Sequence, residues 1–371
     1  VLPDGFGKVN EKGIAFYDAL INELLDNGIE PYITLYHWEL PYEIYKRGGW
    51  MNPEIVEWFG AYARLVAERF SDRVKYFFTL NEPQCFVGLG FLQGCHAPGV
   101  HAPLRDTFEM AHNALKAHGR AVQMLRTYGK QKVEIGYAPT SSMCYPETEK
   151  PEDIEAARKA LFAIPEDIFN WTWNVAWWSD PVILGEYPEE GMKRFEAFLP
   201  EITDEDMKLI SQPIDFYGQN IYNGRCIRMG ADGQPEEVKR SAGFPKTATN
   251  WPVTPEALYW GPKFLYERYQ KPIYITENGM ACHDTISLDG KVHDPNRIDF
   301  LARYLTNLKH AADEADIRGY FQWSLMDNFE WDKGYAERFG IIYVDFKTQE
   351  RIWKDSAYWY RDLIRKNGEI L

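Results

Sequence analysis

The feature that most constrains this chain is a recurring alternation of short apolar runs with longer segments of helical periodicity. Six runs rich in β-branched and aromatic residues stand at residues 31–38, 74–83, 133–139, 214–222, 271–279 and 317–325. They are apolar on both faces, which is typical of strands in a parallel sheet that helices cover. The alternation therefore predicts an α/β fold with six parallel strands.

Helix signals fill the segments around these runs. Asn10 is suited to cap a helix that Gly28 ends, and Asn52-Pro53 begins another. Further helical patterns cover about residues 104–129, 153–177, 255–269, 297–316 and 355–366. No linker or repeat interrupts the series, so residues 1–371 are predicted to form a single domain of barrel type.

Polar residues gather at the C-terminal ends of five of the six runs. They are His37-Trp38, Asn81-Glu82, Asn220 with Tyr222, Glu277-Asn278, and the group Asp327, Asn328, Glu330 and Trp331. In an α/β barrel these strand ends meet at one rim, where active sites lie. A single polar residue of this kind is as often a cap or a loop residue, but five strand ends that share the pattern favour a site.

Two of these residues, Glu82 and Glu277, are glutamates that follow a strand core and lie next to an Asn. Cleavage of a glycosidic bond requires a pair of carboxyl groups, one to protonate the leaving oxygen and one to act as base or nucleophile. With 55 acidic residues in the chain, other pairs exist. The strand-end context singles out Glu82 and Glu277 as the predicted catalytic pair.

Composition argues against several other classes of function. The net charge of −14 without a basic block disfavours nucleic acid as a partner, and no apolar run reaches the ~20 residues of a membrane helix. Five scattered cysteines predict reduced thiols and a cytoplasmic location. Cys95-His96 and His101 share one loop but lack a metal-site spacing, so we expect no metal, and no glycine-rich nucleotide motif indicates a cofactor.

The chain resembles β-glucosidases of glycoside hydrolase family 1. The stretches that carry the resemblance are "TLYHWELP" (34–41), "FTLNEP" (78–83), "GFLQGCHAPG" (90–99), "AHGRAV" (117–122), "DFYGQNIY" (215–222), "YITENG" (274–279), "WSLMDNFEW" (323–331) and "GYAERFGIIYVD" (334–345). They span almost the whole chain in the family's order. The resemblance implies a (β/α)8 TIM barrel and a retaining mechanism.

What the resemblance implies for the site is specific. Glu82 is the expected general acid/base and Glu277 the nucleophile, with Tyr222 hydrogen-bonded to that nucleophile. The other expected sugar-binding residues are His37, Trp38, Asn81, Asn220, Trp323, Glu330, Trp331 and Phe339. Among them, Asn81 would hold the 2-hydroxyl and Glu330 the 4- and 6-hydroxyls. A carboxylate at Glu330 disfavours 6-phosphorylated substrates.

The sequence departs from the family pattern at its beginning and after "NEP". No counterpart of the family's first strand, first helix and second strand is present, so we expect an incomplete barrel with six of eight strands. Three explanations stay open: the segment lies elsewhere, the protein is a truncated form whose open edges are covered in a homo-dimer or higher oligomer, or it is an inactive fragment. Gln84 stands where many relatives carry Trp, which leaves the aglycone preference open.

Two functions from different classes follow. The first is a retaining β-glucosidase acting on cellobiose, short cello-oligosaccharides or aryl β-glucosides, small-molecule substrates that require no cofactor. The second is a truncated barrel that binds sugars weakly or only self-associates. A β-galactosidase or β-fucosidase preference is a minor alternative. The complete set Glu82, Glu277, Tyr222 and Glu330 favours the first function.

Overall fold

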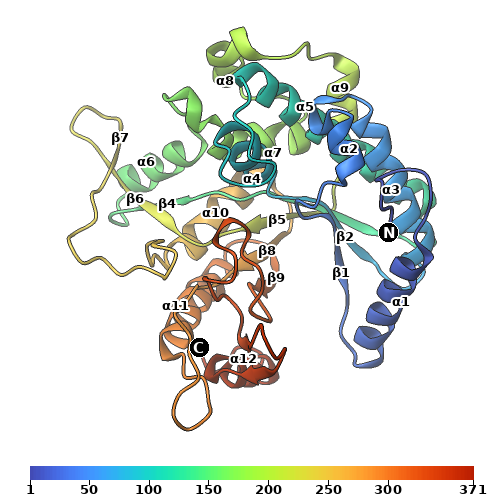
Figure 1. Cartoon of the computed structure of the whole chain (residues 1–371). Coiled ribbons are helices and arrows are strands. Elements are labelled where there is room, and N and C mark those ends of the chain that lie inside the picture. Colours follow the sequence, from blue (N-terminus) through green and yellow to red (C-terminus); the bar gives the residue numbers. More distant parts are fainter. The chain divides into compact units, whose positions relative to one another are not determined.

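The computed structural model describes residues 1–371 as two compact units. The first unit comprises Val1–Thr140 and Ile164–Gly218, and the second comprises Ser141–Ala163 and Gln219–Leu371. Figure 1 shows the helices and strands of both units. None of the helices combines the length and the apolar content that a membrane-crossing segment requires.

The first unit is built on parallel strands. In order across the sheet they are β1 (Tyr32–Tyr36), β2 (Tyr76–Asn81), β3 (Glu134–Ala138) and the beginning of β5 (Phe216–Asn220). Burial of Phe77, Leu80, Ile135 and Tyr137 explains why these strands are apolar on both faces. Gly136 is required beside β5, because a Cβ there would lie 2.0 Å from the ring of Phe216.

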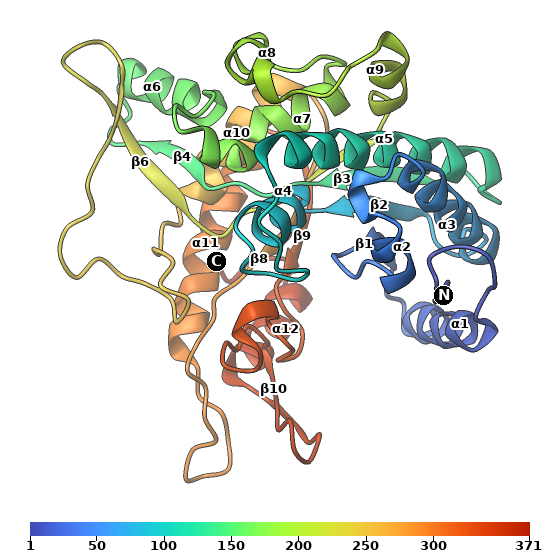
Figure 2. The ribbon, with the colours of Figure 1, turned by 45° about the horizontal axis from the view of Figure 1, so that its top comes forward.

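Eight helices belong to this unit. They are α1 (Glu11–Asp26), α2 (Tyr42–Lys46), α3 (Ile55–Phe70), α4 (Pro83–Val87), α5 (Leu104–Tyr128), α7 (Val175–Ile183), α8 (Glu189–Phe195) and α9 (Asp204–Ile210). Figure 2 shows α5 alongside β2 and β3, and the two long helices α3 and α5 pack on each other. Asn10 caps α1 as predicted, since its side chain accepts from the backbone amides of Lys12 and Gly13.

The second unit contains the parallel pair β8 (Ile273–Asn278) and β9 (Ile317–Gln322). The end of β5 joins β8 through a hydrogen bond from the amide of Ile221 to the carbonyl of Glu277, 2.9 Å long. The helices of this unit are α6 (Pro151–Phe162), α10 (Ala257–Tyr269), α11 (Pro295–Ala311) and α12 (Asp355–Arg365). A small sheet of β4 (Met143–Pro146), β6 (Gly224–Met229) and β7 (Pro235–Glu237) and a hairpin of β10 (Ile342–Val344) and β11 (Arg351–Trp353) complete it.

The six predicted strands are therefore confirmed, each within three residues of its expected bounds at either end. One helix prediction is wrong: residues 153–177 do not form one helical region. The helix α6 ends at Phe162, Pro165 follows, and α7 starts anew at Val175 with Asn174 as its cap. The small sheet and the β10–β11 hairpin were not expected from the sequence. The single-domain and incomplete-barrel expectations stay predictions.

Candidate active site

The ends of β1 and β2 bring a first group of predicted site residues together. The Nδ2 of Asn81 lies 3.2 Å from the Nε2 of His37, and the indole nitrogen of Trp38 donates to the backbone carbonyl of Asn81 at 3.0 Å. These links cross from one strand end to the next, as the parallel register requires. His37, Trp38, Asn81 and Glu82 thus form one cluster at the carboxyl edge of the first unit's sheet.

Burial fixes the protonation state of His37. Loss of solvent lowers its pKa to about 4, so the imidazole is neutral near pH 7. The contact with Asn81 is consistent with a neutral imidazole, because an amide nitrogen is a donor and the Nε2 of His37 must then accept. A neutral imidazole with one donor and one acceptor nitrogen is suited to bind a sugar hydroxyl.

Glu82 sits at a strained turn between β2 and α4. Its φ is +42°, in the left-handed region that a glutamate seldom adopts, and its amide donates to the carbonyl of Ala138 at 2.8 Å. The turn redirects the chain after Asn81, and Glu82 is buried, with only 6% of the residue exposed. Trp38 and Trp331, two other predicted site residues, also have positive φ, at 86° and 44°. Backbone strain of this kind clusters at functional sites.

Cys85 contacts the carboxyl group of Glu82. Its thiol donates to Oε2 over 3.0 Å from the first turn of α4. A thiol is a weak donor, so the contact orients the carboxyl group without binding it strongly. Cys85 was not expected in the site from the sequence, although its three-residue spacing from Glu82 at a helix start is a local sign of this contact.

Gln84 is fully buried beside this turn. Its side-chain amide donates to the carbonyl of Thr140 at 2.9 Å and its carbonyl oxygen accepts from the Thr140 amide at 3.4 Å. Gln84 therefore ties the start of α4 to the loop after β3. This packing accounts for a polar side chain at this buried position.

The ends of β5 and β8 form a second group around Glu277. The hydroxyl of Tyr222 donates to Oε2 of Glu277 at 2.7 Å, and Glu277 as a residue is 7% exposed. A phenol is a good donor to a carboxylate and favours its ionised form. The sequence-based pairing of Tyr222 with Glu277 is therefore present in the structure.

The backbone at Tyr222 is held in place by hydrogen bonds of Tyr304. The hydroxyl of Tyr304 on α11 donates to the Tyr222 carbonyl at 3.0 Å and accepts from the amide of Thr254 at 2.8 Å. Because Tyr304 is buried, this bridge is shielded from water and stiffens the backbone that presents Tyr222.

The side chains of Asn220 and Asn278 are buried and make hydrogen bonds at the strand ends. Asn220 is fully buried and accepts a hydrogen bond from Thr276, while Asn278 donates to the carbonyl of Ile221 at 2.8 Å. Both side chains join β5 to β8. The expected sugar-binding role of Asn220 stays a prediction.

A close backbone approach explains the glycine of "YITENG". A Cβ on Gly279 would lie 1.8 Å from the carbonyl oxygen of Trp323, so only glycine fits. The amide of Trp323 also donates to the carbonyl of Asn278 at 2.8 Å. Trp323 is thereby fixed against the end of the strand that carries Glu277.

Phe339 and Trp251 pack around Tyr222. The ring centroid of Tyr222 lies 5.0 Å from that of Trp251 and 6.1 Å from that of Phe339, and Phe339 is buried. Sequence analysis predicted Phe339 but missed Trp251, which lies in a loop without a motif. The loop that carries Glu330 and Trp331 closes through a bond from the Glu330 amide to the Gly334 carbonyl, 2.7 Å long.

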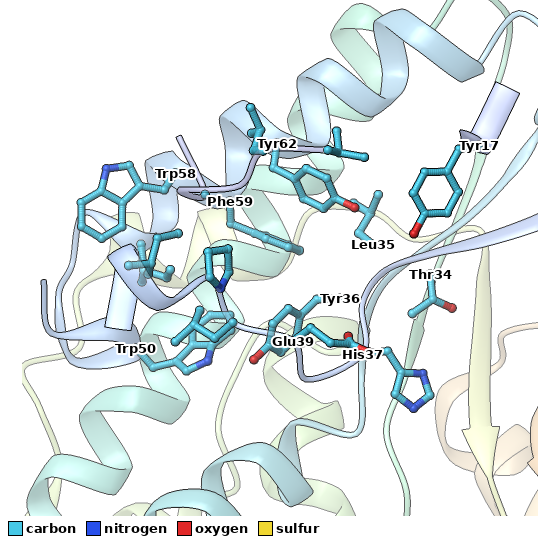
Figure 3. Close-up of a pocket in the computed structure, with 17 residues that line it drawn as sticks. Tyr17, Thr34, Leu35, Tyr36, His37, Glu39, Trp50, Trp58, Phe59 and Tyr62 are labelled. Carbon is cyan, nitrogen blue, oxygen red and sulfur yellow. The ribbon is translucent and has the colours of Figure 1, made fainter. Parts of the chain in front are cut away.

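The structure also contains a cavity of about 470 Å³ in the first unit, shown in Figure 3. Aromatic residues such as Tyr36, Trp50 and Phe59 line it, and burial raises the pKa of Tyr36. Of the predicted site residues only His37 borders this cavity. The cavity therefore adjoins the cluster of His37, Trp38, Asn81 and Glu82 only through His37.

Comparison with known proteins decides the family. The sequence profile of glycosyl hydrolase family 1 matches residues 1–369. The chain belongs to glycosyl hydrolase family 1. β-Glucosidase A of Thermotoga maritima is 43% identical over 99% of this chain and 80% of its own length. β-Glucosidase A of Acetivibrio thermocellus is 41% identical over 99% of this chain and 81% of its own.

Solved structures of family 1 agree with this assignment. The Thermotoga maritima β-glucosidase in complex with glucoimidazole superposes with a TM-score of 0.87 at 43% identity, over 99% of this chain and 81% of that one. The α/β barrel-type fold of the family and its hydrolase class are thereby confirmed for this chain. The relatives bear out the β-glucosidase prediction over the sugar-binding and self-associating alternatives.

Proposed function

We propose that this protein is a retaining β-glucosidase in which Glu277 is the nucleophile and Glu82 the general acid/base. The observation that carries the proposal is the 2.7 Å hydrogen bond from Tyr222 to Glu277. It supports an ionised carboxylate of fixed orientation at the end of a barrel strand, as a nucleophile requires. The names of the relatives, β-glucosidase A in two bacteria, support the substrate class.

The proposed reaction has two displacements. In the first, an oxygen of Glu277 attacks the anomeric carbon, the glycosidic bond breaks, and Glu82 gives its proton to the leaving oxygen. In the second, Glu82 takes a proton from water, the water oxygen attacks the anomeric carbon, and Glu277 leaves as a carboxylate. Both displacements invert the carbon, so the product keeps the β configuration.

The remaining predicted residues recognise the glucosyl ring. We assign the 2-hydroxyl to Asn81, the 3-hydroxyl region to His37 and Trp38, and the 4- and 6-hydroxyls to Glu330 with Trp331. Trp323 would form an apolar floor under the ring, and Phe339 would close the pocket at the 6-position. Asn220 supports the acid/base side. The substrates are cellobiose, short cello-oligosaccharides and aryl β-glucosides, and the reaction requires no cofactor.

Product stereochemistry in the presence of azide tests this assignment. Purified wild type should release 4-nitrophenol from its β-glucoside, and Glu277→Ala should lose roughly 10⁴-fold or more in kcat. Azide, a small external nucleophile, should restore the activity of the Glu277→Ala variant and form α-glucosyl azide in one displacement. In Glu82→Ala, azide should attack the glycosyl-enzyme and form the β-azide.

The same experiment can contradict the proposal. A Glu277→Ala variant as active as wild type would show that the activity belongs to a contaminant. An α-azide from Glu82→Ala would exchange the two roles. Wild type that hydrolyses β-galactosides or β-fucosides better than β-glucosides would favour the minor alternative. Self-association and a cytoplasmic location stay predictions.

A further inference from the structure

The second unit contains a cluster of buried charges that the proposed mechanism does not use. The buried charge cluster consists of Asp284, Asp294, Asp327, Arg297 and Lys354, whose side chains are at most 3% exposed. Charged side chains are seldom this completely buried unless they are paired. An apolar cluster of the same volume would often stabilise a fold as well or better, so stability alone does not account for it.

Lys354 joins two loops within the buried charge cluster. Its Nζ donates to Oδ2 of Asp284 at 2.5 Å and to Oδ1 of Asp327 at 2.8 Å. Asp284 lies in the loop after β8, seven residues beyond Glu277, whereas Asp327 lies in the loop after β9. A single ammonium group, located at the start of α12, therefore ties the two loops together.

Arg297 on α11 makes a second connection between the same loops. It pairs with Asp284 and Asp294, and it donates to the carbonyls of Met280 at 3.3 Å and Arg338 at 2.8 Å. Asp284 keeps a lowered pKa: burial alone would raise it, but the charges of Arg297 and Lys354 outweigh burial.

Asp327 is the point where the loop after β9 is anchored. Its carboxylate binds Lys354, binds Arg338 at 2.5 Å, and accepts from the amide of Gly340 at 3.1 Å. The anchored loop contains Trp323 and Glu330 on either side of Asp327, four and three residues away. Loss of one charge would leave others buried and unpaired, so the loop would have to shift.

We propose that Asp327 and Lys354 are positioning residues that set the place of Glu330 and thereby the selectivity for the sugar's 6-hydroxymethyl group. The inference rests on the proposed function, in which Glu330 binds the 4- and 6-hydroxyls. Neither residue touches the substrate. They act through the loop, because their ion pairs connect it to the segment that follows the nucleophile.

The test compares two substrates that differ only at carbon 6. Hydrolysis of 4-nitrophenyl β-D-glucoside and of the β-D-xyloside, which lacks the hydroxymethyl group, is measured as kcat/KM for wild type and Lys354→Met. The glucoside value should fall on the order of 10–100-fold, the range of one hydrogen bond to a charged group, and the xyloside value by less than about fivefold. Lys354→Arg, which keeps the charge, should recover part of the loss.

Lys263→Met is the matched control. The ammonium of Lys263 also bridges two carboxylates in the second unit, Glu267 and Glu314, but it lies on α10 away from both loops. The glucoside-to-xyloside ratio should stay at the wild-type value in this variant. An equal fall for both substrates in Lys354→Met, or an unchanged ratio in a folded variant, would overturn the proposal.

Two further variants keep the result decisive. If Lys354→Met does not fold at the assay temperature, Asp327→Asn tests the same ratio, because the amide keeps the size and one acceptor oxygen. Glu330→Gln separates this inference from the proposed function. If Glu330→Gln leaves the ratio unchanged, or if wild type cleaves no β-glucoside, the proposed function has failed rather than the positioning role.

Discussion

Glu82 and Glu277 each accept a hydrogen bond from a neighbouring side chain, and these two donors differ in strength. Glu82, in the first unit, accepts from the thiol of Cys85 at 3.0 Å. Glu277, in the second unit, accepts from the phenol of Tyr222 at 2.7 Å. A phenol stabilises a carboxylate much better than a thiol does.

The difference matches the two roles that a retaining glycosidase needs. A nucleophile has to be anionic when substrate arrives, so a strong and rigid donor is an advantage. An acid/base has to release and regain a proton in every turnover, and a weak donor orients it without fixing its charge. The first unit also buries neutral histidines near its strands, whereas the second buries paired charges.

The largest effect that separates the two glutamates is leaving-group dependence. Glu82→Ala should lose roughly 10²–10⁴-fold in kcat/KM on cellobiose, whose alcohol leaving group needs a proton. With 2,4-dinitrophenyl β-glucoside the loss should be far smaller, because that leaving group departs as an anion. Steady-state kinetics on both substrates measures the difference, and an equal loss on both would end the assignment of Glu82 as acid.

The two units should respond differently to acid. Burial lowers the pKa of His37 to about 4 and of His118 to about 3, so the unfolded chain takes up protons below about pH 6.5 that these folded histidines refuse. The free energy of unfolding therefore falls as the pH drops from about 6.5 toward the folded pKa values, by on the order of 1.4 kcal/mol per pH unit for each such histidine. Asp284, with its lowered pKa, begins to destabilise the second unit only below its unfolded value of 3.8.

Hydrogen exchange at pH 7 and pH 5, corrected for the intrinsic rate, checks this order. Peptides from β2 and α5 in the first unit should lose protection at pH 5 before peptides from β8 and α11 in the second. His118→Gln should reduce the pH dependence of the urea midpoint. Earlier opening of the second unit would contradict the explanation by histidine burial.

Removal of the Tyr222 hydroxyl tests the stronger donor directly. Tyr222→Phe should lower kcat/KM on β-glucosides by about 10–100-fold, since a hydrogen bond to a charged group contributes about 1.5–3 kcal/mol. Tyr320→Phe is the matched control, because its hydroxyl donates to Asn278 at 2.8 Å and not to Glu277. Similar losses in both variants would indicate a packing effect rather than an effect on the nucleophile.

Removal of the Cys85 thiol should have the smallest effect. Cys85→Ala is expected to lower kcat/KM by about two- to fivefold and to move the alkaline limb of its pH profile upward by a few tenths of a unit. The direction follows because a donor to the ionised carboxylate of Glu82 favours that form, and its loss favours the acid. Cys144→Ala is the control, because Cys144 is also a buried thiol but lies in the second unit, and this variant should leave the pH profile unchanged. A downward shift of the alkaline limb in Cys85→Ala would contradict the role of Cys85 as a donor.

The strands and much of the site were predictable because they depend on local pattern. The runs at 74–83 and 271–279 became β2 and β8, and Asn10 caps α1 as its position indicated. The wrong helix at residues 153–177 arose because apolar periodicity continues on both sides of Pro165. The short strands of the small sheet lacked a signal of their own, since their pairing joins Met143–Pro146 to a segment some 80 residues away.

The sequence by itself determined the pattern of polar and apolar residues along the strands, the position of the two glutamates at strand ends, and the family. Only the tertiary structure decided that Trp251 packs on Tyr222 and that Lys354 joins Asp284 to Asp327. Local pattern sets which face of a strand or helix is buried. Which side chain meets which across a fold depends on chain crossings of tens of residues, and these leave no periodic trace in the sequence.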